Sequence, residues 1–328
     1  MNPGIRPPPS AAGPPQGANA PSGGSEPREA GSVGARYFGR VMSAMVTPFD
    51  ASGRLDLDAA QRLARWLADH GNDGLVIAAT TGESPTLDDR ERCDLVRAVA
   101  EAVTIPVVAG MGTYDTRHSI ELTRQAQALG AAGVILVGPY YNRPPQAGIE
   151  AHFRAVAEAT KLPCMLYDVP GRTGRRIDEA VLLRLFREVP NIVAFKDATG
   201  DPPAAAALVA QAGDRFDLYS GDDAYTLPLM AVGAVGVVST TAHWTGPWFQ
   251  RMFDAFANGD PALAREIHAR LIPSFRFANT EASVYSMSVK AMLRTLGHAV
   301  GECRLPLPPT PAGVEDAARR VWQELNAP

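Results

Sequence analysis

The sequence predicts an α/β protein with the (β/α)8 TIM-barrel fold and a small C-terminal helical domain. Eight short apolar runs alternate with longer amphipathic stretches, and near-continuously apolar runs are typical of parallel strands covered on both faces. The length of 328 residues suits one large barrel plus a smaller appendage. A doubly wound open sheet would give the same alternation, but eight units with no Gly-x-Gly-x-x-Gly sequence at the first helix favour the barrel.

Each apolar run gives the bounds of one expected strand. In chain order the strands are Val41–Val46, Gly74–Ala78, Pro106–Gly110, Gly133–Val137, Cys164–Tyr167, Asn191–Lys196, Phe216–Ser220 and Gly236–Ser239. The stretches between them have helical periodicity, with Asp or Thr near several starts and Gly near several ends, as helix caps require. The clearest expected helices are Leu57–His70, Asp88–Val103, Thr116–Leu129 and Gln146–Thr160.

The chain divides by composition into three parts. Residues 1–35 are rich in Pro, Gly, Ala and Ser and are expected to form a disordered tail, because such a segment buries too little apolar surface to offset the entropy of ordering. Residues 36–258 form the predicted catalytic barrel. Residues 259–328 carry no further strand signal and predict a helical C-terminal domain, with helices over Pro261–Leu271, Ser283–Leu296 and Val314–Leu325.

Composition narrows the class of partner. The formal net charge is −4 and the pI is near 5.9, so no basic face is expected to bind nucleic acid or an anionic membrane, and a small metabolite is the better partner. Three widely spaced cysteines, no apolar window of transmembrane length and no secretory signal pattern predict a cytoplasmic protein. The six histidines show no ligand spacing, and we expect neither a metal ion nor a cofactor.

Lys196 is the residue best placed for chemistry, because it closes the apolar run Asn191–Lys196. Active sites of such barrels form at the C-terminal ends of the strands. A lysine at an apolar barrel mouth loses part of its hydration, which lowers its pKa and supplies the neutral amine that attacks a carbonyl to form a Schiff base. Alone, this residue would be interpreted as a solvated lysine at a strand end, so its neighbours decide.

Other strand ends carry side chains suited to the same chemistry. The turn Thr80-Thr81-Gly82 offers consecutive N–H groups and hydroxyls, which can hold a carboxylate such as that of pyruvate. Tyr167 leaves its strand one barrel position before Lys196, and its phenol can donate and accept a proton. Arg172 follows a Pro-Gly turn, where a guanidinium group can clamp the carboxylate of a second substrate.

Five motifs in this order resemble the dihydrodipicolinate synthase branch of the pyruvate-dependent class I aldolase superfamily. They are Thr-Thr-Gly-Glu-Ser at 80–84, Pro-Tyr-Tyr-Asn at 139–142, Tyr-Asp-Val-Pro-Gly-Arg-Thr at 167–173, Lys-Asp-Ala-Thr-Gly-Asp at 196–201 and Ser-Gly-Asp-Asp at 220–223. The resemblance implies a homotetrameric barrel enzyme in which Lys196 forms an imine with pyruvate. The derived enamine would attack L-aspartate-4-semialdehyde and give 4-hydroxy-tetrahydrodipicolinate for lysine and diaminopimelate biosynthesis.

The resemblance also implies residue roles. Tyr167, Thr80 and Tyr141 would form a proton relay, with Tyr141 supplied across a subunit interface. The arginine in the turn after Tyr167 favours a synthase over the sialic acid lyase branch, which typically lacks it. The implied substrate-binding residues are Thr81, Arg172, Gly221 and Val238.

Two alternatives stay open. A 2-keto-3-deoxy sugar acid aldolase or dehydratase would use the same Lys196 imine with a different substrate. A non-catalytic barrel that binds small acids would keep the fold without the activity, since a fold does not imply a function.

Residues near the turn depart from the family pattern and give a first prediction. The segment Pro85–Arg90 lacks the histidines that help some members bind lysine as an inhibitor, and His118 stands where an acidic residue would be expected. We therefore expect weak feedback inhibition by lysine. A titration of the condensation rate with lysine checks this, and strong inhibition at physiological concentrations would contradict it.

Overall fold

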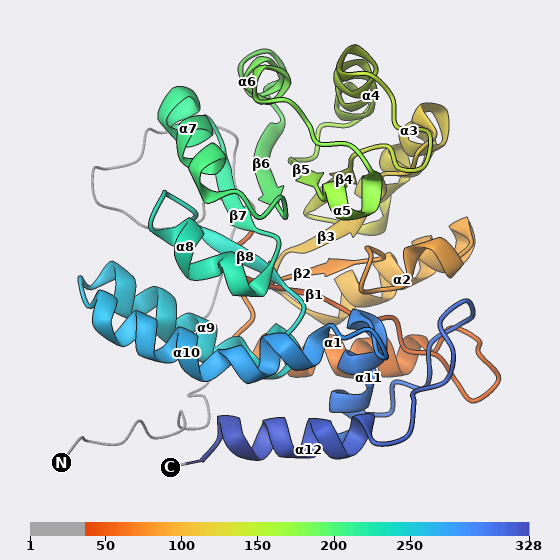
Figure 1. Cartoon of the computed structure of the whole chain (residues 1–328). Coiled ribbons are helices and arrows are strands. Elements are labelled where there is room, and N and C mark those ends of the chain that lie inside the picture. Colours follow the sequence, from red (N-terminus) through yellow and green to blue (C-terminus); the bar gives the residue numbers. More distant parts are fainter. Residues whose placement is uncertain (1–36, 328) are drawn as a thin grey trace.

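The computed structural model describes residues 37–327 and is a closed (β/α)8 barrel (Figure 1). Each strand is parallel to its neighbours in chain order, and β8 pairs with β1 to close the barrel. The predicted fold class is confirmed. The predicted disordered tail lies outside the described residues.

The strands begin and end within two residues of the expected bounds. They are β1 Val41–Ala44, β2 Gly74–Ile77, β3 Val107–Gly110, β4 Gly133–Val137, β5 Cys164–Asp168, β6 Ile192–Asp197, β7 Asp217–Ser220 and β8 Gly236–Ser239. All but the last residue of β4 are buried, as expected for strands covered on both faces.

Helices follow the strands and surround the barrel (Figure 1). The α-helices of the barrel region are α1 Leu57–Asp69, α2 Asp89–Ala102, α3 Thr116–Ala126, α4 Gln146–Glu158, α5 Pro170–Thr173, α6 Glu179–Glu188, α7 Pro202–Ala212, α8 Thr226–Met230 and α9 Ala242–Ala257. Short 3-10 helices lie at η1 Ser84–Thr86, η2 Gln127–Leu129, η3 Gly213–Arg215 and η4 Asp223–Tyr225. Several of the α-helices begin with an aspartate cap, as the sequence indicated. At the start of α2, for example, the Asp88 carboxylate accepts from the N–H of Glu91 at 2.8 Å.

Two apolar layers hold the barrel together. Side chains of the outer layer pack between the strands and the surrounding helices, whereas Met42, Val76, Val108 and Met165 belong to the layer inside the barrel. Phe38 is fully buried and touches the position of Gly133, where an added Cβ would lie 2.6 Å from the phenyl ring. Side chains fill the interior of the barrel, so a ligand is expected to bind at its mouth, where the strands end.

The C-terminal segment forms α10 Pro261–Ala278, α11 Tyr285–Thr295 and α12 Val314–Leu325. Figure 1 shows these blue helices gathered along one side of the barrel. The helix expected over Pro261–Leu271 is longer than predicted, because it continues through Pro273. That proline removes one N–H, and packing holds the helix together; the indole N–H of Trp244 in α9 donates to the Ser274 hydroxyl at 3.0 Å. The division into a barrel and a separate C-terminal domain stays a prediction.

The end of β2 depends on a close approach by β3. Ala78 has a φ of 51°, a left-handed conformation that is unusual for a residue with a side chain. Gly110 lies against it, and a Cβ there would sit 2.3 Å from the Ala78 carbonyl oxygen. Glycine at this position therefore lets the chain turn toward Thr80 immediately after the strand.

Gly110→Ala is expected to destabilise the fold by about 1–3 kcal/mol, since the added methyl group overlaps backbone that cannot move freely. Denaturant unfolding measures the change. Gly171→Ala is the control, because a Cβ there meets nothing within 4 Å. Equal stability of the two variants would contradict the close approach.

Candidate active site

A cavity of about 750 Å³ lies at the C-terminal ends of the strands. Strand ends and the loops that follow them form one wall, and α10 and α11 form the other. The strand side includes Thr80, Thr81, Tyr167, Lys196, Gly221, Asp222, Asp223 and Thr240, and the helical side includes His268, Arg276, Asn279 and Tyr285. Of the residues predicted from the sequence, six share this cavity: Thr80, Thr81, Tyr167, Arg172, Lys196 and Gly221.

Lys196 lies on β6, directly beside Tyr167 of β5 in the strand register. Its side chain is almost completely buried, with 5% of the residue exposed, and Nζ lies 4.2 Å from the centre of the Tyr167 ring. Burial lowers the pKa of Lys196 from 10.5 to about 8; nearby Asp223 raises it, and Arg172 lowers it. At pH 7 about one such amine in ten is uncharged, against about one in three thousand for an ordinary lysine.

Tyr167 lines the same cavity, and its aromatic ring lies against the amine of Lys196. The residue is 7% exposed, and burial raises its pKa above the ordinary value. The phenol is therefore protonated at neutral pH and is a donor in the resting site.

The turn after β2 presents its polar groups to the same cavity through Thr80 and Thr81. Its carbonyl oxygens already have partners: that of Ala79 accepts from the N–H of Ser84 at 3.1 Å, and that of Thr80 from the N–H of Glu83 at 3.1 Å. The carbonyl of Thr81 accepts from the Ser286 hydroxyl at 2.9 Å, and that of Gly82 from the Thr47 hydroxyl at 2.6 Å. With these acceptors occupied, the turn offers donors to a ligand, which suits a carboxylate.

Arg172 lies on the one-turn helix α5 and lines the cavity, with its guanidinium carbon 5.3 Å from the centre of the Tyr285 ring. A guanidinium group in this position can hold the carboxylate of an incoming substrate. Gly221 lies deeper, where a Cβ would come within 3.0 Å of Cγ of Lys196. A side chain at Gly221 would therefore displace the stem of the lysine.

The structure does not bring Tyr141 and Val238 to the lining of this cavity. Tyr141 is 94% exposed and has a φ of 69°, so the backbone is strained while the phenol points away from its own barrel interior. Val238 is 1% exposed and belongs to the apolar layer inside the barrel. The substrate-binding and relay roles expected for these two residues stay predictions.

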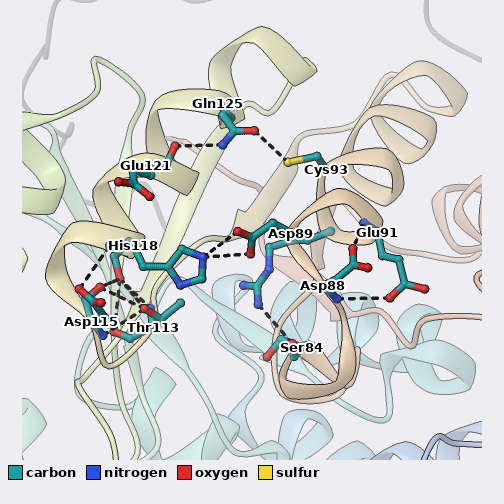
Figure 2. Close-up of polar contacts among 12 residues, drawn as sticks. Ser84, Asp88, Asp89, Glu91, Cys93, Thr113, Asp115, His118, Glu121 and Gln125 are labelled. Carbon is teal, nitrogen blue, oxygen red and sulfur yellow. Dashed lines mark hydrogen bonds and ion pairs between the residues drawn. The ribbon is translucent and has the colours of Figure 1, made fainter.

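His118 lies away from the cavity, on α3. Figure 2 shows its ring directed at Asp89 of α2, and Nε2 lies 2.9 Å and 3.0 Å from the two carboxylate oxygens. The imidazole thus pairs with an acidic side chain on the neighbouring helix.

Asp223 and Tyr285 are among the cavity residues that were not assigned from the sequence. Asp223 stands in the Ser-Gly-Asp-Asp motif, and its carboxylate accepts from the N–H groups of Thr240 and Thr241 at 3.3 and 2.8 Å. Its burial raises its pKa, and its charge faces Lys196. Tyr285 comes from α11, a helix whose sequence gave no chemical signal, because its place beside Arg172 depends on how the C-terminal helices pack.

Within residues 37–327 no group of three or more His, Cys, Asp or Glu side chains is placed to hold a metal ion. Among the same residues no helix has both the length and the apolar character needed to cross a membrane.

The model of the dihydrodipicolinate synthetase family matches residues 37–324. The chain belongs to this family. It is 51% identical over 272 residues to the 4-hydroxy-tetrahydrodipicolinate synthase of Moorella thermoacetica, covering 82% of this chain and 92% of that protein. It is 53% identical over 272 residues to 4-hydroxy-tetrahydrodipicolinate synthase 2 of Streptomyces coelicolor, covering 82% of this chain and 89% of that protein. The resemblance inferred from the five motifs is confirmed.

Solved structures of the same family share the fold. The dihydrodipicolinate synthase of Cyanidioschyzon merolae, solved with lysine bound, superposes with a TM-score of 0.86 at 42% identity, covering 89% of this chain and 99% of that one. A dihydrodipicolinate synthase of Bacillus anthracis gives a TM-score of 0.84 at 42% identity, covering 87% and 98% of the two chains.

The pKa of Lys196 gives a pH prediction. Because this pKa is lowered to about 8, the neutral amine increases as pH rises toward 8 and changes little above it. Trapping of a pyruvate imine with cyanoborohydride should accelerate about tenfold per pH unit below that midpoint and then level off. Intact mass at fixed times measures the rate. A midpoint near 10.5 would show a solvated lysine, and Lys196→Arg is the control that should give no adduct.

Proposed function

We propose that the chain catalyses the Schiff-base condensation of pyruvate with L-aspartate-4-semialdehyde to 4-hydroxy-tetrahydrodipicolinate. The observation that carries the proposal is the buried Lys196 amine, with its lowered pKa, beside Tyr167 in a cavity that also holds Thr80 and Arg172. Relatives that carry the synthase name match the chain at about 50% identity over most of its length. The protein is therefore a Schiff-base-forming lyase of lysine and diaminopimelate biosynthesis.

The neutral amine of Lys196 attacks C2 of pyruvate, and the resulting carbinolamine loses water to form the imine. Loss of a proton from C3 gives the enamine, whose carbon attacks the aldehyde of the second substrate, and the new alkoxide takes up a proton. The amino group of that substrate then attacks C2 and displaces Lys196, which closes the ring. The net change joins one molecule of each substrate and releases one water.

Each proton in this sequence needs a group that can donate and accept it. The centre of the Tyr167 ring lies 4.2 Å from the amine of Lys196 and its phenol starts protonated, so it suits protonation of the departing carbinolamine oxygen. Thr80, in the same wall of the cavity, can return a proton to Tyr167, with Tyr141 as the link between this relay and solvent. The donors of Thr80 and Thr81 face the pyruvate carboxylate, and Arg172 faces the carboxylate of the semialdehyde.

The assembly proposed is a homotetramer in the cytoplasm. Tyr141 supports a role for the assembly, because its exposed phenol and strained backbone lie outside its own cavity. Tyr114 is also exposed and packs edge-on against Tyr140, with ring centres 5.2 Å apart, so aromatic surface continues around Tyr141. A second copy of the chain would cover this surface and receive the Tyr141 phenol.

A condensation assay tests the activity directly. Purified protein receives pyruvate with L-aspartate-4-semialdehyde, or 2-keto-3-deoxy sugar acids alone, and products are identified by mass. Condensation with the semialdehyde is expected. Cleavage of sugar acids without condensation would favour the aldolase alternative, and absence of a borohydride-reduced pyruvate adduct at Lys196 would favour a non-catalytic binding barrel.

Two substitutions distinguish the role of Lys196 as nucleophile from the role of Tyr167 in proton transfer. Lys196→Arg keeps a positive charge but no neutral amine, and turnover should be lost while the fold is kept. Tyr167→Phe should slow turnover by about 10²–10⁴-fold without preventing the adduct, since one proton-transfer group typically contributes that much. Steady-state kinetics and circular dichroism measure both, and wild-type turnover in either variant would remove that residue from the mechanism.

Mixing two inactive variants tests whether Tyr141 acts across an interface. In oligomers reassembled from Lys196→Arg and Tyr141→Phe chains, a site with an intact lysine can receive an intact tyrosine only from its neighbour. Random reassembly should restore about a quarter of wild-type turnover if subunits act in pairs. If Tyr141 serves its own barrel, the mixture stays as inactive as its parents.

A further inference from the structure

A buried ion pair outside the cavity joins the active-site turn to helix α11. Nζ of Lys290 lies 2.7 Å from Oε1 of Glu83, and the two side chains are 0% and 1% exposed. Glu83 directly follows Gly82 at the end of the turn, whereas Lys290 lies in the middle of α11. Removing two charges from water is expensive, and apolar residues of similar volume often stabilise a fold as well as such a pair does. Stability alone therefore gives little reason for it.

The remaining polar atoms of the pair also have partners. Nζ of Lys290 donates to the carbonyl of Glu302 at 2.9 Å, and Oε2 of Glu83 accepts from the N–H of Arg304 at 2.8 Å. The ammonium group lies 4.3 Å from the centre of the Phe49 ring. The pair thus joins three segments that are distant in sequence and fixes both carboxylate oxygens of Glu83.

The backbone of the turn needs such support. Ala78 and Glu83 have φ values of 51° and 56°, so left-handed residues bracket Thr80, Thr81 and Gly82. Such conformations are strained in residues with side chains and persist where surrounding contacts hold them. The Glu83 side chain is one of these contacts.

Helix α11 reaches the turn at a second point. The hydroxyl of Ser286, which is 4% exposed, donates to the Thr81 carbonyl at 2.9 Å. The preceding residue, Tyr285, lines the cavity beside Arg172. One helix therefore holds the back of the turn through Ser286 and Lys290 and forms the opposite wall of the cavity through Tyr285.

We propose that α11 positions the Thr80–Gly82 turn, through the Glu83–Lys290 ion pair and the Ser286 hydrogen bond, so that its donors face the carboxylate of a keto acid bound at Lys196. Glu83, Lys290 and Ser286 are positioning residues, since they act through the turn and do not line the cavity. The inference rests on the proposed function, because it concerns the same keto-acid site. The C-terminal helices therefore complete the keto-acid site as well as covering it.

Variants of α11 separate positioning from stability. Lys290→Met leaves the Glu83 carboxylate buried without its cation and should destabilise the fold. Glu83→Gln combined with Lys290→Met removes both charges, and the glutamine oxygen can still accept from the N–H of Arg304. This double variant should recover much of the unfolding stability lost by Lys290→Met. Its turnover and its rate of pyruvate imine formation should stay about 10²-fold below wild type, since small misplacements of catalytic groups have effects of that size.

Ser286→Ala is the second variant, because it removes one hydrogen bond and no charge. Its KM for pyruvate should rise severalfold while kcat and the pH midpoint of imine trapping stay near wild type. A contact that served stability alone would leave this KM unchanged.

Arg294→Met is the matched control on the same helix. Arg294 donates to Glu315 at 2.8 Å, to the Gly301 carbonyl at 2.7 Å and to the Thr310 hydroxyl at 2.8 Å, and pairs with Glu302 at 3.1 Å; none of these partners belongs to the turn. Its loss should lower stability without changing the KM for pyruvate. If the folded double variant and Ser286→Ala both keep imine formation and KM within twofold of wild type, the positioning role is wrong. Failure of the wild-type protein itself to trap pyruvate would instead contradict the proposed function.

Discussion

The reactivity of the cavity depends on the burial of one amine, that of Lys196. Lys196 is placed on a parallel strand inside a filled barrel, so water reaches it only from the mouth, and burial lowers its pKa to about 8. The surroundings adjust this effect without cancelling it. Asp223 favours the ammonium form, and Arg172 disfavours it. A fully paired lysine would stay charged, and a solvated one would be an ordinary surface residue, so the partial desolvation is what makes the cavity reactive.

The cavity is built from two kinds of structure. The strand ends supply Lys196, Tyr167 and the turn at Thr80, and their relative positions follow from the strand register of the barrel. The C-terminal helices supply the second wall and reach behind the first through the buried carboxylate of Glu83. The barrel provides the rigid geometry, and α11 holds the turn that follows β2 in place above it.

The sequence predicted the parts of this arrangement that have a local signature. Buried parallel strands are apolar throughout, so their bounds were found within two residues, and Lys196 with Tyr167 followed from adjacent strand ends. Tyr285 could not be found this way, because its periodicity on α11 is explained by packing and its approach to Arg172 is a tertiary contact. The ion pair of Glu83 was missed for the same reason, since an isolated lysine in a helix gives no sign of its partner.

The contact between Glu83 and Lys290 spans 207 positions of the chain. Ribosomes release a protein from its first residue onward, so every strand of the barrel is available before α11 exists. A growing chain can therefore form the strand that carries Lys196 first, but the Glu83–Lys290 pair can form only after α11 has been synthesised. The formation of the barrel strands is thus separated in time from the formation of the contact that joins Glu83 to α11.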